Sequence, residues 1–141
     1  MKRWNSIPVV EAAIYIWCIF LFVEDMKALG MESGAIADSQ ITASSEYDVY
    51  HGPERARLHT RETDVYLRGA WVAATNDLNQ WLQVDLGKTF QVCAAATQGD
   101  RGSDGNGSKH EWVTHFKLSY SPDGDSWTTY KYGNGDRKSV V

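Results

Sequence analysis

The stretch that decides the fold is LGMESGAIADSQITASS at Leu29–Ser45. A second segment farther along the chain, NQWLQVDLGK at Asn79–Lys88, supports the same fold. In the second segment Leu82, Val84 and Leu86 alternate with polar residues. This period-two pattern is typical of a strand that buries one face. It predicts β structure in the part of the chain that starts at residue 29.

Three further segments support the same class. The apolar residues of Phe116–Tyr120 alternate with polar ones, and Ser121–Gly124 (SPDG) supplies the Pro and Gly of a tight turn before Trp127–Tyr130, so a hairpin is predicted. Gln91–Gln98 carries apolar residues in succession, which predicts a central strand covered on both faces. After residue 29 no segment shows helical periodicity. The residues alone therefore predict an all-β sandwich or barrel.

The length and the charge of the chain limit the number of domains and the kinds of ligand that it can bind. A chain of 141 residues holds one domain, with no room for a separate catalytic unit. The net charge is −4, and the 14 Lys and Arg residues are scattered along the chain. A nucleic-acid surface needs a basic patch, so nucleic-acid binding is excluded.

The N-terminal segment has the character of a targeting signal. Lys2 and Arg3 precede the apolar run Ala12–Val23, which has the order and length of a secretory signal peptide. The run is shorter than the roughly 20 apolar residues of a membrane-spanning helix. We therefore predict that residues 1–28 are a signal peptide or an uncleaved signal anchor, and that the protein is secreted or membrane-tethered.

These segments together resemble a known family. With PERARL (Pro53–Leu58), ATQG (Ala96–Gly99) and WVTHFKLSYSPDGDSW (Trp112–Trp127), they resemble the discoidin, or coagulation factor V/VIII type C, domain. The resemblance covers nearly everything after residue 28. It implies the discoidin-like jelly-roll β-sandwich or barrel of galactose-binding-like domains.

The resemblance also implies an incomplete domain. Relatives continue with more strands after the turn near Gly133–Asp136, and they usually join their termini by a disulfide. This chain stops at Val141, and its two cysteines are Cys18 in the N-terminal segment and Cys93 in an apolar run. Residues 29–141 are therefore expected to be a partial discoidin domain, incomplete at the C-terminus.

Binding in the family resides in loops at one end of the barrel, and three segments match those loops. They are Glu46–Gly52, Arg61–Gly69 and the glycine-rich Asp100–His110. Loops on a rigid β scaffold are common recognition sites. The candidate ligand-binding residues are Tyr47, Asp48, Tyr50, His51, Asp64, Tyr66, Arg68 and Arg101.

The chemistry of these residues favours sugars or proteins as ligands. The tyrosine rings can pack on a pyranose, and the acidic, basic and imidazole groups can hydrogen-bond hydroxyls. The predicted function is a non-catalytic extracellular recognition and cell-adhesion module that binds cell-surface or matrix glycans, or a protein ectodomain. The alternatives are a peripheral binder of anionic phospholipid membranes and an accessory carbohydrate-binding domain separated from a larger enzyme.

Other conspicuous residues are assigned to the framework. Trp71, Trp81 and Trp127 lie at or beside strand signals, where large aromatic side chains supply core area. Arg55 and Arg57 resemble the family's framework arginines, so an ion pair with a carboxylate such as Asp85 is expected. Gln98, before a glycine, is interpreted as a polar group that satisfies a loop.

The chain contains no sequence motif typical of an enzyme active site or of a metal site. Asp100, Asp104 and Asn106 are rich in oxygen ligands, but they lack the spacing and closing Glu of a calcium loop. The four histidines lack zinc-site spacing, and no nucleophile, phosphate-binding or dinucleotide motif is present. We predict no enzyme activity and no cofactor, with Ca²⁺ kept as an alternative. Asn106-Gly107-Ser108 is an N-glycosylation sequon, so Asn106 is predicted to carry a glycan in the secretory pathway.

Overall fold

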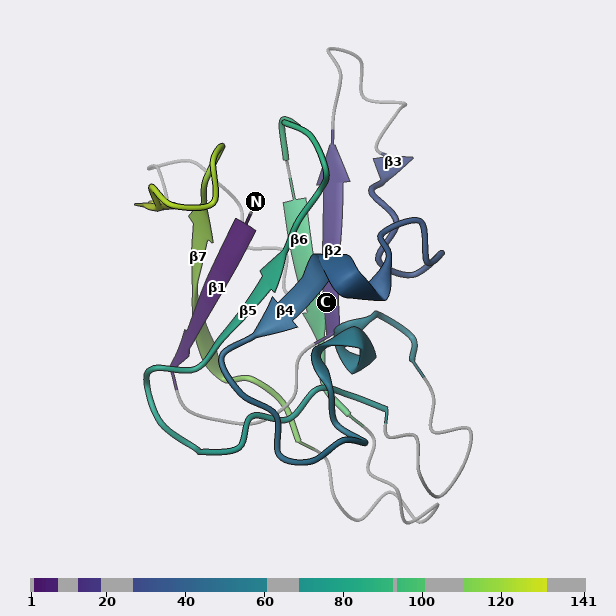
Figure 1. Ribbon diagram of the computed structural model, residues 1–141, viewed down its shortest axis with the longest axis vertical. Coiled ribbons are helices and arrows are strands. Elements are labelled where there is room, and N and C mark those ends of the chain that lie inside the picture. The colour runs from purple at the N-terminus through teal and green to yellow at the C-terminus, as the bar shows by residue number, and fades with distance from the viewer. Residues whose placement is uncertain are drawn as a thin grey trace.

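The fold is a sandwich of two antiparallel sheets (Figure 1). The computed structural model describes the backbone of residues 2–7 and 13–18 and the whole of residues 27–60, 69–92, 94–100 and 111–131. The five-stranded sheet has the order β4 (Ile41–Ala43), β5 (Trp81–Val84), β1 (Lys2–Ile7), β7 (His115–Tyr120) and β8 (Thr128–Thr129). The three-stranded sheet has the order β3 (Lys27–Ala28), β2 (Ala13–Cys18) and β6 (Ala94–Gln98). This architecture confirms the predicted jelly-roll β-sandwich.

The core lies under the strands that the sequence pattern identified. Leu82 and Val84 of β5 are fully buried, as their alternation with polar neighbours predicts. Two short 3₁₀ helices, η1 (Asp38–Gln40) and η2 (Pro53–Ala56), flank β4 in the chain. The buried cluster that joins these elements comprises Met31, Ile36, Ile41, Ala56, Trp71, Leu82 and Val84.

The LGMESG turn that precedes η1 has a backbone that only glycine accommodates. Gly30 has φ +111°, and a Cβ built on it would lie 2.7 Å from the Cβ of Ala35. The turn is closed by the Ile36 N–H, which donates to the Gly30 carbonyl at 3.2 Å. This return of the chain brings the side chains of Met31 and Ile36 into the same buried cluster.

Both N-terminal strands occupy central positions in the sheets. β1 lies between β5 and β7, pairing Lys2 with Val84 on one side and Ile7 with His115 on the other. β2 lies between β3 and β6, with Ala13 opposite Gln98. From the sequence, these segments are predicted to belong to a signal peptide or signal anchor that ends at residue 28, and that boundary stays a prediction. The structure adds that each segment is paired with strands of the domain.

The strand predicted for Gln91–Gln98 differs from expectation. It was expected to be central and covered on both faces, but β6 is an edge strand of the three-stranded sheet among the described residues. Ala94 is exposed, and Ala95 to Gln98 are half-buried. The apolar run consists largely of alanines, which count as apolar in a pattern but have little surface to bury.

The predicted hairpin is present. β7 and β8 pair through Ser119 and Thr129, and the turn between them is organised by Asp123. The Asp123 carboxylate accepts the backbone N–H groups of Ser126 and Asp125 at 2.8 and 2.9 Å and the Ser121 hydroxyl at 2.7 Å. These donors, the Ser126 N–H foremost, hold the pKa of the Asp123 carboxyl well below its usual range.

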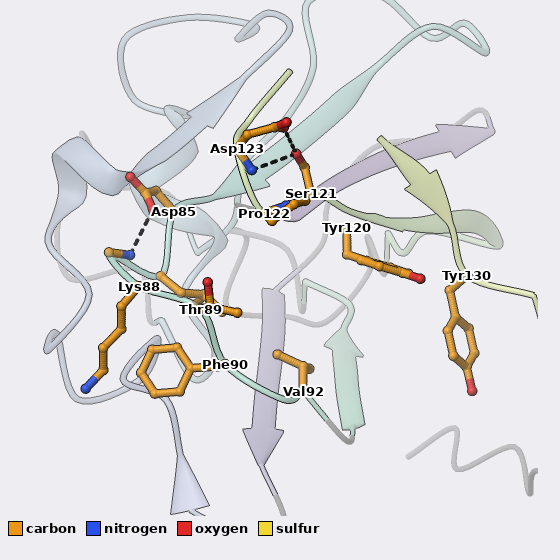
Figure 2. A pocket seen from close by; sticks show the side chains of 12 residues that line it. Asp85, Lys88, Thr89, Phe90, Val92, Tyr120, Ser121, Pro122, Asp123 and Tyr130 are labelled. Atoms are coloured by element: carbon orange, nitrogen blue, oxygen red, sulfur yellow. Dashed lines mark hydrogen bonds between the residues drawn. The ribbon is translucent and has the colours of Figure 1, made fainter. Parts of the chain in front are cut away.

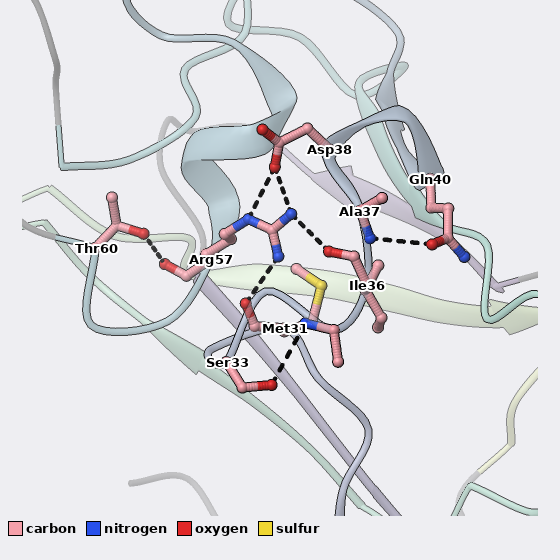
Figure 3. A network of polar contacts seen from close by, with 9 residues as sticks. Met31, Ser33, Ile36, Ala37, Asp38, Gln40, Arg57 and Thr60 are labelled. Carbon is pink, nitrogen blue, oxygen red and sulfur yellow. Dashed lines mark hydrogen bonds and ion pairs between the residues drawn. The ribbon is translucent and has the colours of Figure 1, made fainter.

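Arg57 is a framework residue, as predicted, but its partner is Asp38 and not Asp85 (Figure 3). Its guanidinium donates to the Asp38 carboxylate and to the backbone carbonyls of Met31 and Ile36, at 3.0 and 2.7 Å. The Asp85 carboxylate accepts the N–H of Gly87 instead, at 2.8 Å. Arg57 therefore holds the LGMESG turn against η2.

Candidate functional site

One end of the sandwich carries the loops singled out in the sequence. β4 and β5 are antiparallel, with Ala43 opposite Leu82, so the segment after β4 and the segment before β5 emerge at the same end. β1 is antiparallel to both β5 and β7, which places the segment before β7 there as well. We call this end, formed by residues 44–51, 69–80 and 111–114, the loop end. It is the lower end in Figure 1.

A buried glutamine fixes two of these loops to each other. The Gln80 side-chain oxygen accepts the hydroxyls of Ser44 and Ser45 at 2.7 and 2.6 Å, and its NH₂ donates to Thr75 and Asp77 at 2.8 and 3.1 Å. Gln80 is 8% exposed, so these bonds replace water. The serines of the ITASS motif thus anchor the start of the first loop to the base of the second.

The first loop is also held along its length. The Tyr47 N–H donates to the Val72 carbonyl at 2.8 Å, and the Val72 N–H donates to the His51 carbonyl at 3.3 Å. The buried Trp71 donates its indole N–H to the Ser45 carbonyl at 2.9 Å. Because both ends of residues 45–51 are bound to residues 71 and 72, the side chains between them project from a fixed base.

Asp48, Tyr50 and His51 form a local constellation at this loop. One carboxylate oxygen of Asp48 accepts His51 Nδ1–H at 2.6 Å and the Tyr50 backbone N–H at 2.9 Å. The hydrogen bond from His51, followed by that from Tyr50, lowers the pKa of the Asp48 carboxyl. The ring of Tyr47 meets the His51 ring edge-on, with centroids 5.6 Å apart.

This geometry sets the chemistry that the loop offers. With Nδ1–H bound to an ionised carboxylate, a neutral His51 carries its acceptor lone pair on Nε2. In that tautomer Nε2 is free in charge and geometry to accept a hydrogen bond from the hydroxyl or the cationic N–H of a ligand. Within the described residues no Ser, Thr or Cys side chain hydrogen-bonds to Nε2.

The structure brings together four of the eight predicted ligand-binding residues, namely Tyr47, Asp48, Tyr50 and His51. Tyr47 is 66% exposed and Tyr50 is 38% exposed, whereas the His51 side chain is only 16% exposed. Asp48 and His51 therefore shape the loop as well as offering polar atoms. The other predicted residues, Asp64, Tyr66, Arg68 and Arg101, and the sequon residue Asn106, lie outside the described residues.

Three exposed apolar side chains at the loop end were not predicted. Val49, Leu78 and Trp112 are 73%, 58% and 54% exposed. Leu78 and Trp112 each lie three residues before a strand, and Val49 lies six residues after β4. All three are outside the alternating pattern, and that position is the signal in the sequence that could have identified them. They add an apolar component to a surface whose predicted residues are aromatic and polar.

Metal-ligand clusters and membrane-spanning helices are both absent from the part of the chain that the structure describes. No group of three or more His, Cys, Asp or Glu side chains there is arranged to hold a metal ion. Asp104 and Asn106, two of the three residues weighed for Ca²⁺, lie outside the described part of the chain. The described residues contain no helix with the length and apolar character needed to cross a bilayer.

Comparison with known proteins gives a consistent result. A family model described as the F5/8 type C domain matches residues 40–141. Human neuropilin-1 is 39% identical over 109 residues, the discoidin domain-containing receptor A of Caenorhabditis elegans is 40% identical over 113, and mouse coagulation factor VIII is 42% identical over 113. These alignments cover 77%, 77% and 78% of this chain.

The same alignments cover only a small part of each relative. The shares are 11% of neuropilin-1, 14% of the receptor and 4% of factor VIII. The chain therefore spans about a seventh or less of the length of these relatives. No solved structure gave a significant match.

Proposed function

Because the chain belongs to the F5/8 type C, or discoidin, domain family, we propose that it is a non-catalytic recognition module that binds through its loop end. Its ligands are cell-surface or matrix glycans, or a protein ectodomain. The observation that carries the proposal is the exposed Tyr47–Tyr50 pair on a loop that Gln80 and Val72 hold in place. A fixed loop loses little conformational freedom when it binds, so its contacts translate into affinity.

The polar groups beside the tyrosines suit a hydroxyl-bearing ligand. A sugar that stacks on a tyrosine ring presents its hydroxyls at the ring edge, where His51 Nε2 accepts one hydrogen bond. The Asp48 carboxylate keeps the imidazole in that tautomer. Acidic, aromatic loops also suit a peptide surface, and for that reason the protein ectodomain remains in the proposal.

The cellular setting follows from the same family membership. Two similar proteins bear the names of a receptor and a coagulation factor. We propose an extracellular location, secreted or membrane-tethered, a role in cell adhesion, and a glycan on Asn106.

Expression in secretory eukaryotic cells should give a product whose mobility shifts on enzymatic deglycosylation, and Asn106→Gln should remove the shift. An unglycosylated cytosolic product would contradict this location.

A glycan array with matched variants tests the ligand. Changing both Tyr47 and Tyr50 to Ala should reduce array binding at least about tenfold, because the stacking contacts are lost. Tyr130→Ala removes a tyrosine of similar exposure far from these loops and should leave binding unchanged. Equal binding by the loop variant and the parent would contradict the proposed site, provided that the far-UV spectra agree.

A second function, peripheral binding to anionic phospholipid, is favoured by Val49, Leu78 and Trp112. Exposed apolar side chains at one end of a domain can enter the interfacial region of a bilayer. Val49→Ser with Leu78→Ser should then reduce co-sedimentation with phosphatidylserine vesicles and leave glycan binding intact. If only vesicle binding is found for the parent, membrane binding replaces glycan binding as the proposed function.

A further inference from the structure

The end of the sandwich opposite the loop end contains a pocket of about 560 Å³ (Figure 2). The antiparallel register places residues 85–92, which follow β5, and residues 121–127, which follow β7, at this end. The apolar and aromatic side chains that line the pocket are Leu86, Phe90, Val92, Tyr120, Pro122 and Tyr130. Leu86 and Val92 pack against the core cluster, whereas Tyr120 and Tyr130 are 42% and 45% exposed.

One wall of the pocket is continuous with a sheet edge. Tyr130 N–H donates to the Leu118 carbonyl at 2.7 Å, which places Tyr130 on the same face of the sheet as Leu118 and Tyr120. β8 is the last strand of the five-stranded sheet among the described residues. The ladder pairs Thr128 with Tyr120, so the N–H and C=O of Thr129, between the two bonded positions, face away from β7.

An extended chain is the partner that such an edge accepts. A peptide that adds to β8 would bond to the outward N–H and C=O of Thr129, and every second side chain of that peptide would face the side of Tyr120 and Tyr130. The pocket has the volume to take one apolar side chain from that row. A rounded small molecule would leave the edge of β8 unused.

The charges at the pocket favour a basic residue in the peptide. Two carboxylates, Asp85 and Asp123, line it against one ammonium group, Lys88. Asp123 is held ionised by the hydrogen bonds of its turn. Lys88 lies over the Phe90 ring, 5.1 Å from its centroid, on the side of the pocket that residues 85–92 form.

We propose that this pocket and the outer edge of β8 form a docking site for an extended peptide segment of a partner protein, with an aliphatic and a basic side chain on one face. We call it the β8 site. It lies at the opposite end from the loops that carry the proposed function, so both ends can bind at once. The module would then connect two partners.

The test uses the full chain and a synthetic hexapeptide, acetyl-Thr-Lys-Thr-Val-Thr-Thr-amide, whose Lys and Val lie on one face of a strand. Filtered NMR spectra should show contacts between the Val methyl groups and the rings of Phe90 and Tyr130. Replacing the peptide Lys by Gln should weaken binding about 2- to 5-fold and reduce its salt dependence, because an exposed ion pair contributes modestly. The Kd is expected to be on the order of 0.1 to 1 mM, because so few groups make contact.

Two changes test the edge hydrogen bonds from opposite sides. Thr129→Pro removes the outward N–H and keeps the inward ladder, and proline is tolerated on an edge strand. It should weaken binding about 3- to 10-fold. If this variant fails to fold, a second peptide serves instead. In antiparallel addition the Thr between Lys and Val is the residue that bonds to Thr129, so a peptide N-methylated at that Thr loses a bond from the ligand side and should bind equally weakly. Tyr47→Ala at the loop end is the matched control and should leave peptide binding unchanged.

Three results would overturn the proposal. One is the absence of contacts to Phe90 and Tyr130 at millimolar peptide. Another is equal binding of the N-methylated peptide, which would indicate an apolar pocket without strand addition. The third is contacts from the chain's own residues 132–141 to these rings, with peptide excluded. Each result is independent of the glycan array, because Tyr47 and Tyr130 report on different ends of the molecule.

Discussion

A single side chain, Arg57, ties η2 to the LGMESG turn. Its side chain is 16% exposed and donates to one carboxylate and two backbone carbonyls. Arg57→Lys keeps the charge but cannot reach all three acceptors with one ammonium group. We expect the free energy of unfolding to fall by about 2–4 kcal/mol in denaturant titration, because buried carbonyls lose their donors. Asp38→Asn, which removes only the ionic partner, should cost clearly less; an equal cost would contradict this assignment.

The Asp48 carboxylate gives the loop a dependence on pH. Its pKa is lowered from an ordinary value of 3.8 by the hydrogen bond from His51. A lowered pKa in the folded state means that the carboxylate stabilises the loop above pH 3.8, and that this contribution is lost as pH falls through the folded-state value. The amide resonance of Tyr50 should therefore titrate below pH 3.8, and Asp48→Asn should remove the titration. A Tyr50 midpoint above pH 3.8 would contradict the assignment.

Among the elements, the two loops joined by Gln80 should behave as one unit. Gln80→Leu leaves the Ser44 and Ser45 hydroxyls without their acceptor, and we expect a loss of about 1–3 kcal/mol. Faster hydrogen exchange should follow at the Tyr47 amide, whose loop has lost its anchor, and glycan binding should weaken with it. Asn79→Ala, at the exposed neighbouring position, is the control. Unchanged exchange at Tyr47 in Gln80→Leu would show that Trp71 and Val72 fix the loop without Gln80.

The elements also show what local patterns can predict. Leu82 and Val84 lie inward as their alternation indicates, because the side-chain period of a strand is recorded in consecutive residues. The partner of Arg57 was not predictable, because Asp38 and Asp85 are both acidic and the choice depends on how the LGMESG turn folds back. The same holds for Leu78: an exposed apolar residue differs from a buried one only in its surroundings.

At the scale of the whole molecule, β1 and β2 are strands of the two sheets. A cleaved signal peptide, in contrast, would be absent from the mature protein. Deleting residues 1–26 would remove β1 from between β5 and β7 and β2 from between β3 and β6. We expect the shortened chain to lose about 3 kcal/mol or more, a fall of roughly 10 °C or more in Tm by calorimetry. Sequencing the N-terminus of the secreted product is the companion measurement. A secreted product that begins near Lys27 and melts at the same temperature as the full chain would contradict the strand assignment.

The register of β1 also fixes when the larger sheet can be completed. Its residues are synthesised before those of its partners, which are residues 81–84 and 115–120. At about 5–20 residues per second, roughly 6 to 24 s pass before Tyr120 has been added. Until residues 81–84 have been made β1 has no ladder to join, its second ladder forms only after residues 115–120, and contacts so distant in sequence close slowly. The central strand of this sheet is therefore made long before both of its partners, and a chaperone or targeting factor that meets the nascent chain encounters it unpaired.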